Sequence, residues 1–202
     1  MEIRTLIEGK PSSEEHHIFG WSTVMLLQNE ERNVLYDCGN RMHSVLLRKA
    51  LEACGLGVSD ITDVVISHLH FDHVGNLPMF SNARVFLSRA EWESAENTPD
   101  EYHDLSALAY LKARGNIFFT EEGGEPVQGC RVISLPGHTP GLIGLLCAED
   151  TLLASDAVKN RQELEAGIGS LCWNAAESRE SISRIKRLAK VLYPGHDGRI
   201  DL

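Results

Sequence analysis

The sequence of 202 residues lacks the features that mark a secreted or membrane-bound protein. Its first residues do not show the charged-then-apolar pattern of a signal peptide, and no apolar run approaches the roughly 20 residues of a membrane span. Its cysteines are odd in number, widely spaced and without a Cys-X-X-Cys pair, at Cys38, Cys54, Cys130, Cys147 and Cys172. We therefore expect buried thiols in a reducing compartment, and a cytoplasmic protein without a membrane partner.

Positive charge is also scarce, because 19 Lys and Arg face 29 Asp and Glu, for a formal net charge of −10. This balance disfavours a broad nucleic-acid surface, which needs Lys and Arg to neutralise phosphates, although it leaves room for a local basic groove. The length permits one substantial core and is too short for two ordinary domains. We therefore expect a single domain over residues 1–202 with a small-molecule substrate, and a homodimer is left open.

Two common catalytic motifs are missing as well. The sequence contains no Gly-X-Ser-X-Gly nucleophile elbow. It also has no Gly-rich phosphate loop, since Gly123-Gly124 lies in an acidic turn and lacks the Lys-Ser/Thr tail. Neither a serine nucleophile of this type nor a P-loop is therefore expected.

What the sequence does contain is a dense group of metal-binding side chains. His68, His70, Asp72 and His73 fall within six residues, directly after the apolar run Val64–Ile66. Imidazole and carboxylate groups together suit zinc, iron or manganese, and a strand end holds such groups rigidly. A single histidine is more often structural, but three at once with an aspartate indicate a metal site.

Three further candidates share this position at or just past a short apolar run. His138 follows the run 133–135, Asp156 follows 152–154, and His196 follows 191–193. Each alone has an ordinary explanation, as a turn residue or a helix cap. The runs are predicted to be buried strands, and open α/β architectures gather their sites along the edge where such strands end. The recurrence predicts one site that collects all these residues.

Strand and helix signals alternate along the rest of the chain. Strands are predicted at Ile3–Ile7, Thr23–Leu27 and Val34–Tyr36. Helices are predicted over 45–54, over Arg89–Ala95 with Ser88 and Glu91 as a capping box, and over Asp104–Ala113. A last helix has Ile182, Ile185 and Leu188 on one face and Arg179, Arg184, Lys186, Arg187 and Lys190 on the other. We interpret that basic face as a solvated surface.

The combined pattern of His-X-His-X-Asp-His, Gly-His, Ser-Asp and Gly-His resembles the metallo-β-lactamase-fold hydrolases. The resemblance implies an α/β (α+β) fold, a four-layer αββα sandwich in which two sheets are flanked by helices. It also implies two divalent metal ions, for which zinc is expected and iron or manganese remain open. His68, His70 and His138 would hold the first metal, Asp72, His73 and His196 the second, and Asp156 would bridge them.

Two cations held close together would lower the pKa of a shared water towards neutrality and give hydroxide as the nucleophile. Asp72 would ligate the second metal and also act in catalysis, by orienting that hydroxide or moving its proton. The true β-lactamases usually lack the bridging aspartate, so its presence at position 156 points away from antibiotic hydrolysis.

Within the family, the segment from Ser67 to His73 is most similar to the N-acyl homoserine lactonases, which favours an ester or lactone substrate. Those lactonases carry a tyrosine three residues after the bridging aspartate, where this chain has Lys159. Its ammonium would stabilise an oxyanion or hold an anionic substrate group, unless it is simply a surface lysine.

The open alternatives are a phosphodiesterase or ribonuclease of the short single-domain type, a thioester hydrolase of the glyoxalase-II type, and a binding module braced by metals. Pocket candidates lie in the segments 11–21, 98–103 and 159–173. Among them, His16 and His17 are equally compatible with the pocket rim and with solvent. Trp173 fits an apolar pocket wall, although core packing is its more common role.

Overall fold

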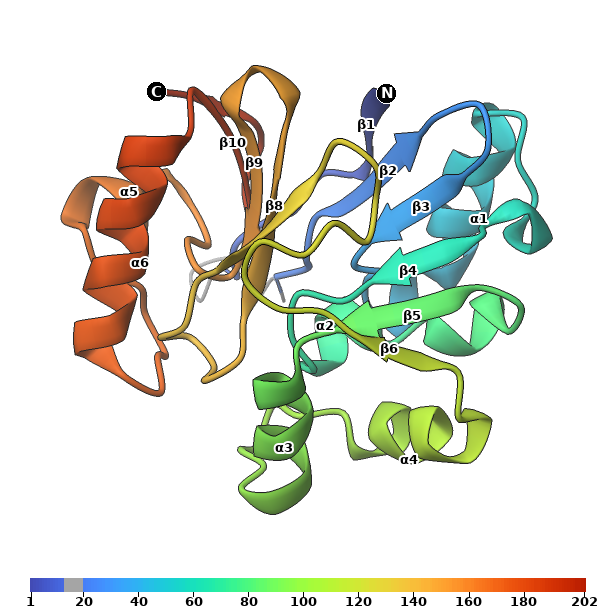
Figure 1. The fold of residues 1–202 in the computed structure, drawn as a ribbon, viewed down its shortest axis with the longest axis horizontal. Helices are drawn as coiled ribbons and strands as arrows, with labels where there is room; N and C mark the ends of the chain where they lie inside the picture. Colours follow the sequence, from blue (N-terminus) through green and yellow to red (C-terminus); the bar gives the residue numbers. More distant parts are fainter. Residues whose placement is uncertain (13–19) are drawn as a thin grey trace.

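Two mixed β-sheets face one another in the computed structural model, which describes residues 1–12 and 20–202 (Figure 1). The first sheet has the strand order β1 (Glu2–Ile7), β2 (Val24–Gln28), β3 (Asn33–Tyr36), β4 (Asp63–Val65), β5 (Arg84–Leu87) and β6 (Ile117–Phe119). The second has the order β11 (Ile200–Asp201), β10 (Val191–Pro194), β9 (Thr151–Ser155), β8 (Ile143–Cys147) and β7 (Arg131–Ser134). His16 and His17 lie outside the described residues.

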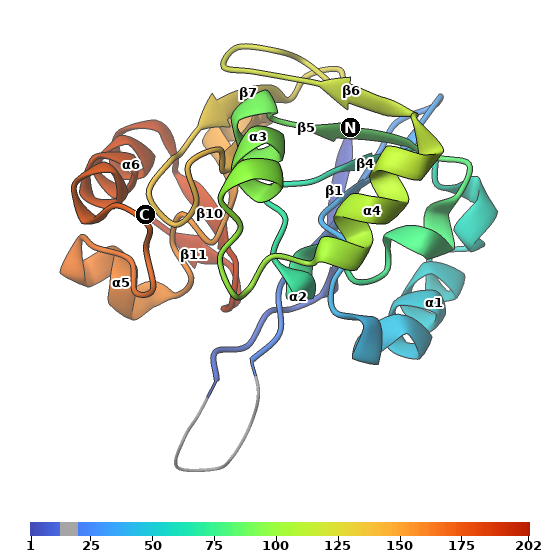
Figure 2. The same cartoon turned by 90° about the horizontal axis from the view of Figure 1, so that it is seen from below.

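Helices cover the outer face of each sheet (Figures 1 and 2). The α-helices are α1 (Ser44–Ala53), α2 (Phe71–Val74), α3 (Arg89–Asn97), α4 (Leu105–Arg114), α5 (Arg161–Ala166) and α6 (Ala175–Leu188). Helices α1 and α4 lie on the first sheet, and α5 and α6 on the second. Val74 of the short helix α2 packs in the same apolar layer as α1 and α4. The predicted αββα sandwich is therefore confirmed.

Three clusters of apolar side chains pack between the four layers of helices and sheets. They arise because successive side chains of each strand point to opposite faces of its sheet. Leu26 of β2 packs in the layer beneath α1 and α4, whereas its neighbours Met25 and Leu27 face the second sheet. Successive side chains of a strand point to opposite faces, so the apolar residues at positions 24–27 make β2 buried on both sides. On the second sheet, Leu152 packs against α6 and Leu153 faces the first sheet.

Local signals in the sequence account for the helix ends. Asp104 is the N-cap of α4, and its carboxylate accepts from the backbone N–H groups of Ser106 and Ala107. Gly115 ends the same helix in the left-handed conformation. Along α6, Arg184 forms an ion pair with Glu122, so that part of its basic face already has an acidic partner. None of the helices in the described ranges is long and apolar enough to cross a membrane.

The prediction of buried thiols holds for Cys38 alone, since Cys54 and Cys172 are free but only partly buried. Cys130 and Cys147 instead form a disulfide. The reason lies in the β7–β8 hairpin, whose register pairs Arg131 with Leu146 and so places the two cysteines opposite each other across the strands. Spacing along the chain does not reveal this. The cytoplasmic location, which was inferred from the cysteines, stays a prediction.

Strand direction brings the predicted ligands to one edge of the molecule. Strands β3 and β4 are parallel in the first sheet, and β9 and β10 are parallel in the second. Strand β7 is antiparallel to β8, which is antiparallel to β9, so β7 runs in the same direction as β9. The carboxyl ends of β3 and β4 therefore share one edge of the first sheet, and those of β7, β9 and β10 share one edge of the second. His68 follows β4, whereas His138, Asp156 and His196 follow β7, β9 and β10. The two edges adjoin, because ligand atoms from both lie within 4.8 Å of one another.

Candidate metal centre

All seven predicted metal ligands meet at this edge. They form three overlapping groups in which the ligand atoms lie within 4.8 Å of one another. The groups are His68, His70 and His138; His68, His73 and Asp156; and Asp72, His73 and His196. The two outer groups coincide with the predicted first and second metal sets.

Asp156 lies between these two sets. Its Oδ2 is 3.4 Å from His138 Nε2, whereas its Oδ1 is 3.3 Å from both His73 Nε2 and His196 Nε2. One carboxylate thus faces both sets, as a bridging ligand would. Gly195 allows this approach, because a Cβ atom at that position would overlap Asp156 Oδ1.

The imidazoles of the first set turn their lone pairs toward one another. His138 Nδ1 faces the Leu171 carbonyl oxygen at 3.1 Å, and His70 Nε2 faces Asp100 Oδ2 at 3.1 Å, so these two nitrogens carry the hydrogens. The remaining nitrogens, His70 Nδ1 and His138 Nε2, are 3.0 Å apart and both bear lone pairs. Two lone pairs at this distance repel each other unless a cation lies between them.

Buried nitrogen and oxygen atoms without hydrogen-bond partners mark the rest of the site. Among the described residues, the buried side-chain atoms without a hydrogen-bond partner include His68 Nε2, His73 Nε2 and Asp156 Oδ1. A buried polar atom without a partner costs about 1–3 kcal/mol, so three in one place require a reason. Metal coordination supplies one, and the residues present therefore fit a dinuclear divalent metal site.

Asp37 fixes the orientation of two ligand loops, a role that the sequence analysis missed. Its Oδ2 accepts from His73 Nδ1 at 2.8 Å and from the Ser155 hydroxyl at 3.0 Å. The Ser67 hydroxyl also donates to Oδ2 at 2.8 Å, and it faces His68 Nδ1 at 2.9 Å. Asp37 thereby leaves the Nε2 atoms of His68 and His73 free to bind metal. The sequence offered one signal, since Asp37 also follows a strand at this edge.

Glu91 joins the two loops of the first set, and the sequence analysis missed this role too. Its Oε1 accepts from the Leu69 N–H at 2.9 Å, and its Oε2 accepts from the Thr139 hydroxyl at 2.6 Å. Its side chain is fully buried. The capping-box prediction is half right, because Ser88 accepts from the Glu91 N–H but the Glu91 carboxylate is turned to the ligand loops instead.

Burial and charge divide the histidines into two classes. Burial lowers the pKa of His68, of His70 and of His138, the last to about 3, so these imidazoles are neutral at pH 7. For His73 and His196, burial also acts to lower the pKa, but nearby carboxylates, Asp156 among them, raise it overall. Protons on these two imidazoles lower the pKa of Asp156, against the effect of its burial.

The segment after Lys159 forms one wall beside the first set. The Lys159 ammonium donates to the Ser170 carbonyl and lies 3.9 Å from Glu163 Oε1. Whether it also contacts a substrate stays a prediction. Trp173 is 60% exposed, so the core-packing interpretation was wrong. The backbone N–H of Trp173 donates to the His138 carbonyl at 3.1 Å. Its backbone therefore adjoins the site.

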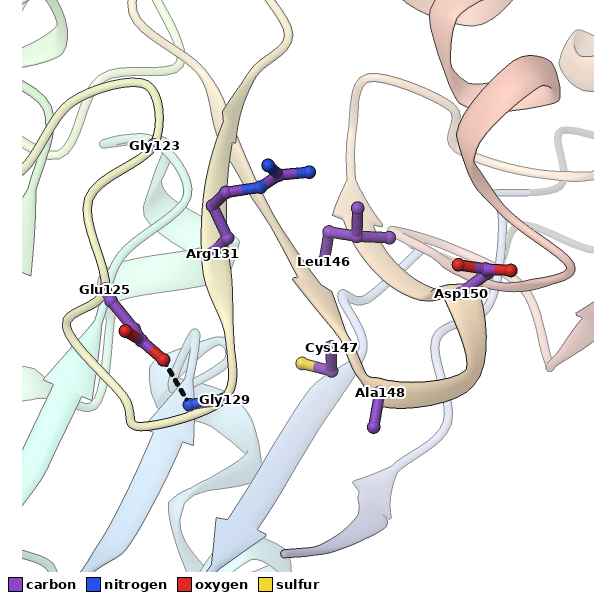
Figure 3. Close-up of a pocket in the computed structure, with 8 residues that line it drawn as sticks. All are labelled: Gly123, Glu125, Gly129, Arg131, Leu146, Cys147, Ala148 and Asp150. Carbon is purple, nitrogen blue, oxygen red and sulfur yellow. Dashed lines mark hydrogen bonds between the residues drawn. The ribbon is translucent and has the colours of Figure 1, made fainter.

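A separate hollow of about 410 Å³ lies beside the β7–β8 hairpin (Figure 3). Its lining includes Glu125, Arg131, Cys147 and Asp150, and none of the seven predicted ligands lines it. In Figure 3 the Glu125 carboxylate accepts from the Gly129 N–H within the loop. This hollow is therefore separate from the candidate metal centre.

Comparison with known proteins agrees with this site. The family model described as "Metallo-beta-lactamase superfamily" matches residues 19–196, and the chain belongs to that superfamily. An N-acyl homoserine lactonase from Bacillus sp. is 30% identical over 155 residues, which cover 73% of this chain and 60% of the lactonase. Metallo-beta-lactamase domain-containing protein 1 of Xenopus laevis is 27% identical over 197 residues, which cover 96% of this chain and 78% of that protein.

Solved structures share the fold. A Thermotoga maritima protein assigned to the metallo-beta-lactamases superimposes with a TM-score of 0.76 at 20% identity, over 100% of this chain and 99% of the other. A quorum-quenching N-acyl homoserine lactone lactonase gives a TM-score of 0.73 at 26% identity, over 87% and 79%. The chain thus shares the fold of this superfamily, and its match spans about 60% of the length of the lactonases.

The first prediction concerns the bridge. Asp156→Ala removes both carboxylate oxygens, so metal content should fall from two ions per chain to about one. Hydrolysis should fall by more than the roughly 10–100-fold that loss of an outer-shell partner costs. Elemental analysis and kinetics check this, with Asp201→Ala as the control for loss of an exposed aspartate. Two tightly held ions in the Asp156→Ala protein would contradict the bridging role.

The second prediction concerns pH. Carboxylates raise the pKa values of His73 and His196, whereas burial lowers those of the first set, so protons compete with a cation more at the second set than at the first. As pH falls, those protons bind more strongly, and affinity should drop about tenfold per pH unit for each proton displaced. Between a pH of about 7.5 and a pH of about 6, metal titrations should therefore show a larger loss of affinity at the second set than at the first. Equal weakening at both sets would contradict this division.

Proposed function

We propose that this chain hydrolyses an ester or lactone bond of the acyl homoserine lactone type. The reaction type depends on one observation, the buried imidazole nitrogens and Asp156 carboxylate gathered in one cluster, in a chain without a serine nucleophile elbow. The substrate class is supported by the 30% identity to lactonases over 73% of the chain. We propose zinc as the metal, since sites of three histidines or histidines with a carboxylate are typical of catalytic zinc.

Two bound divalent cations would supply a water that ionises near neutral pH and positive charge that polarises the substrate carbonyl. The residues then divide the work. Asp156 keeps the two ligand sets at a fixed separation. The Asp72 side chain is 12% exposed and lies 3.4 Å from His196, at the boundary between cluster and solvent. It can accept the proton that water loses and pass it to the leaving group.

Apolar side chains next to the ligands support an acyl substituent on the substrate. Phe71, between two predicted ligands, is 47% exposed, and Leu171 and Trp173 are 69% and 60% exposed. The backbones of Leu171 and Trp173 both bond His138. Large apolar residues that stay exposed near a polar cluster are typical of a binding surface.

A phosphodiesterase is the second candidate, because two-metal sites also stabilise the attacking and leaving oxygens of a phosphodiester. The net charge of −10 disfavours a nucleic-acid substrate. A small phosphodiester would still fit the metal chemistry.

The test is a substrate panel with the zinc-loaded protein: N-hexanoyl homoserine lactone, an aryl ester, a thioester and bis(4-nitrophenyl) phosphate. We expect the highest kcat/KM on the lactone, with a rate that rises through a pH of about 7 and then levels off.

Lys159→Met should lower kcat and kcat/KM together by roughly 10²–10³-fold if its ammonium stabilises an oxyanion. Lys190→Met, at an exposed lysine paired with Asp150, is the control.

Three results of this experiment would contradict parts of the proposal. A highest kcat/KM on the phosphodiester would overturn the lactone proposal in favour of the second candidate. No hydrolysis of any substrate by protein that holds two zinc ions would overturn both. A Lys159→Met protein that matches Lys190→Met on every active substrate would remove Lys159 from the catalytic residues.

A further inference from the structure

Each histidine of the first set faces a hydrogen-bond acceptor with the ring nitrogen that points away from the cluster. Only one of these three acceptors is charged. His68 Nδ1 faces the Ser67 hydroxyl at 2.9 Å, and His138 Nδ1 faces a backbone carbonyl at 3.1 Å. His70 alone faces a carboxylate, with its Nε2 at 3.1 Å from Asp100 Oδ2. Asp100 lies in the turn between α3 and α4, about thirty residues along the chain from its partner.

The turn holds this carboxylate in place. Asp100 Oδ1 accepts from the N–H groups of Tyr102 and His103, at 2.9 and 3.1 Å. The Asp100 N–H donates in turn to His103 Nδ1 at 3.0 Å. One oxygen is thereby occupied by the turn, and the other is left to accept from His70.

The same turn is joined to the ligand loop by its backbone. The Phe71 N–H donates to the Tyr102 carbonyl at 3.0 Å, and the Asp104 N–H donates to the Leu69 carbonyl at 2.9 Å. His70 and His103 form a bridge pair between these bonds. Carboxylate and imidazole therefore belong to one rigid unit, although Asp100 itself is partly exposed to solvent.

We propose that Asp100 is a positioning residue that holds His70 with its Nδ1 lone pair turned to the first metal. By accepting the Nε2 hydrogen, the carboxylate fixes the tautomer and the ring angle, and its charge makes the imidazole a better donor to a cation. The inference depends on the metal-binding part of the proposed function and is independent of the substrate.

Asp100→Asn tests this role with little change in shape. The amide oxygen can still accept from Tyr102 and His103, but the amide nitrogen would present a donor to the Nε2 hydrogen of His70. The matched control is Asp104→Asn, since Asp104 also accepts two backbone N–H bonds in this turn and its side chain contacts no predicted ligand. Asparagine is as good an N-cap as aspartate, so α4 should keep its cap.

The readout is metal binding by the metal-stripped protein. In zinc titrations against a competing chelator, Asp100→Asn should weaken zinc binding at the first set roughly 10–100-fold. Asp104→Asn should match wild type. The absorption bands of Co²⁺ bound at the first set should shift in Asp100→Asn only. Thermal melting of the metal-free proteins checks that both variants fold.

The possible failures are distinguishable. A wild-type protein that binds no zinc would overturn the proposed function and this inference with it. A wild type that binds two ions, with unchanged affinity and Co²⁺ bands in a folded Asp100→Asn protein, would overturn the role of Asp100 alone. An equal loss of affinity in Asp100→Asn and Asp104→Asn would also overturn it, because the effect would then come from the turn as a whole.

Discussion

The site depends on the repulsion between unshared electron pairs that the fold forces together. His70 Nδ1 and His138 Nε2 are 3.0 Å apart, while the hydrogens on their other nitrogens are engaged by Asp100 and by a carbonyl. Hydrogen bonding within the cluster cannot relieve this repulsion unless one ring takes up a second proton, and burial lowers the pKa of both rings. Positive charge from outside the chain is the remaining solution, which a divalent cation supplies.

The fold maintains this arrangement through buried carboxylates that connect distant loops. Asp37, at the end of β3, holds the loop after β4 and the end of β9 at once. Glu91, in α3, connects the loops after β4 and β7. The two sheets pack on each other through apolar side chains, and these buried polar links join the ligand loops across that packing.

The sequence predicted strands and the seven candidate ligands because those signals are local, whereas the four layers were implied by the family resemblance. Apolar runs mark the strands, and the candidate ligands lie in the segments that follow such runs. The residues that orient the ligands could not be predicted in this way. Asp37 acts on His73, 36 residues along the chain, and Glu91 looked like part of a helix cap. The Cys130–Cys147 disulfide depends on the hairpin register, and Trp173 stays exposed although its size and apolarity suggested the core.

The central claim is that this cluster binds two divalent cations, and anomalous scattering from crystals of the zinc-loaded protein tests it most directly. We predict two peaks, one between His68, His70 and His138 and one between Asp72, His73 and His196, with Asp156 contacting both. A single peak, or imidazoles that remain face to face without a cation in zinc-saturated crystals, would contradict the account.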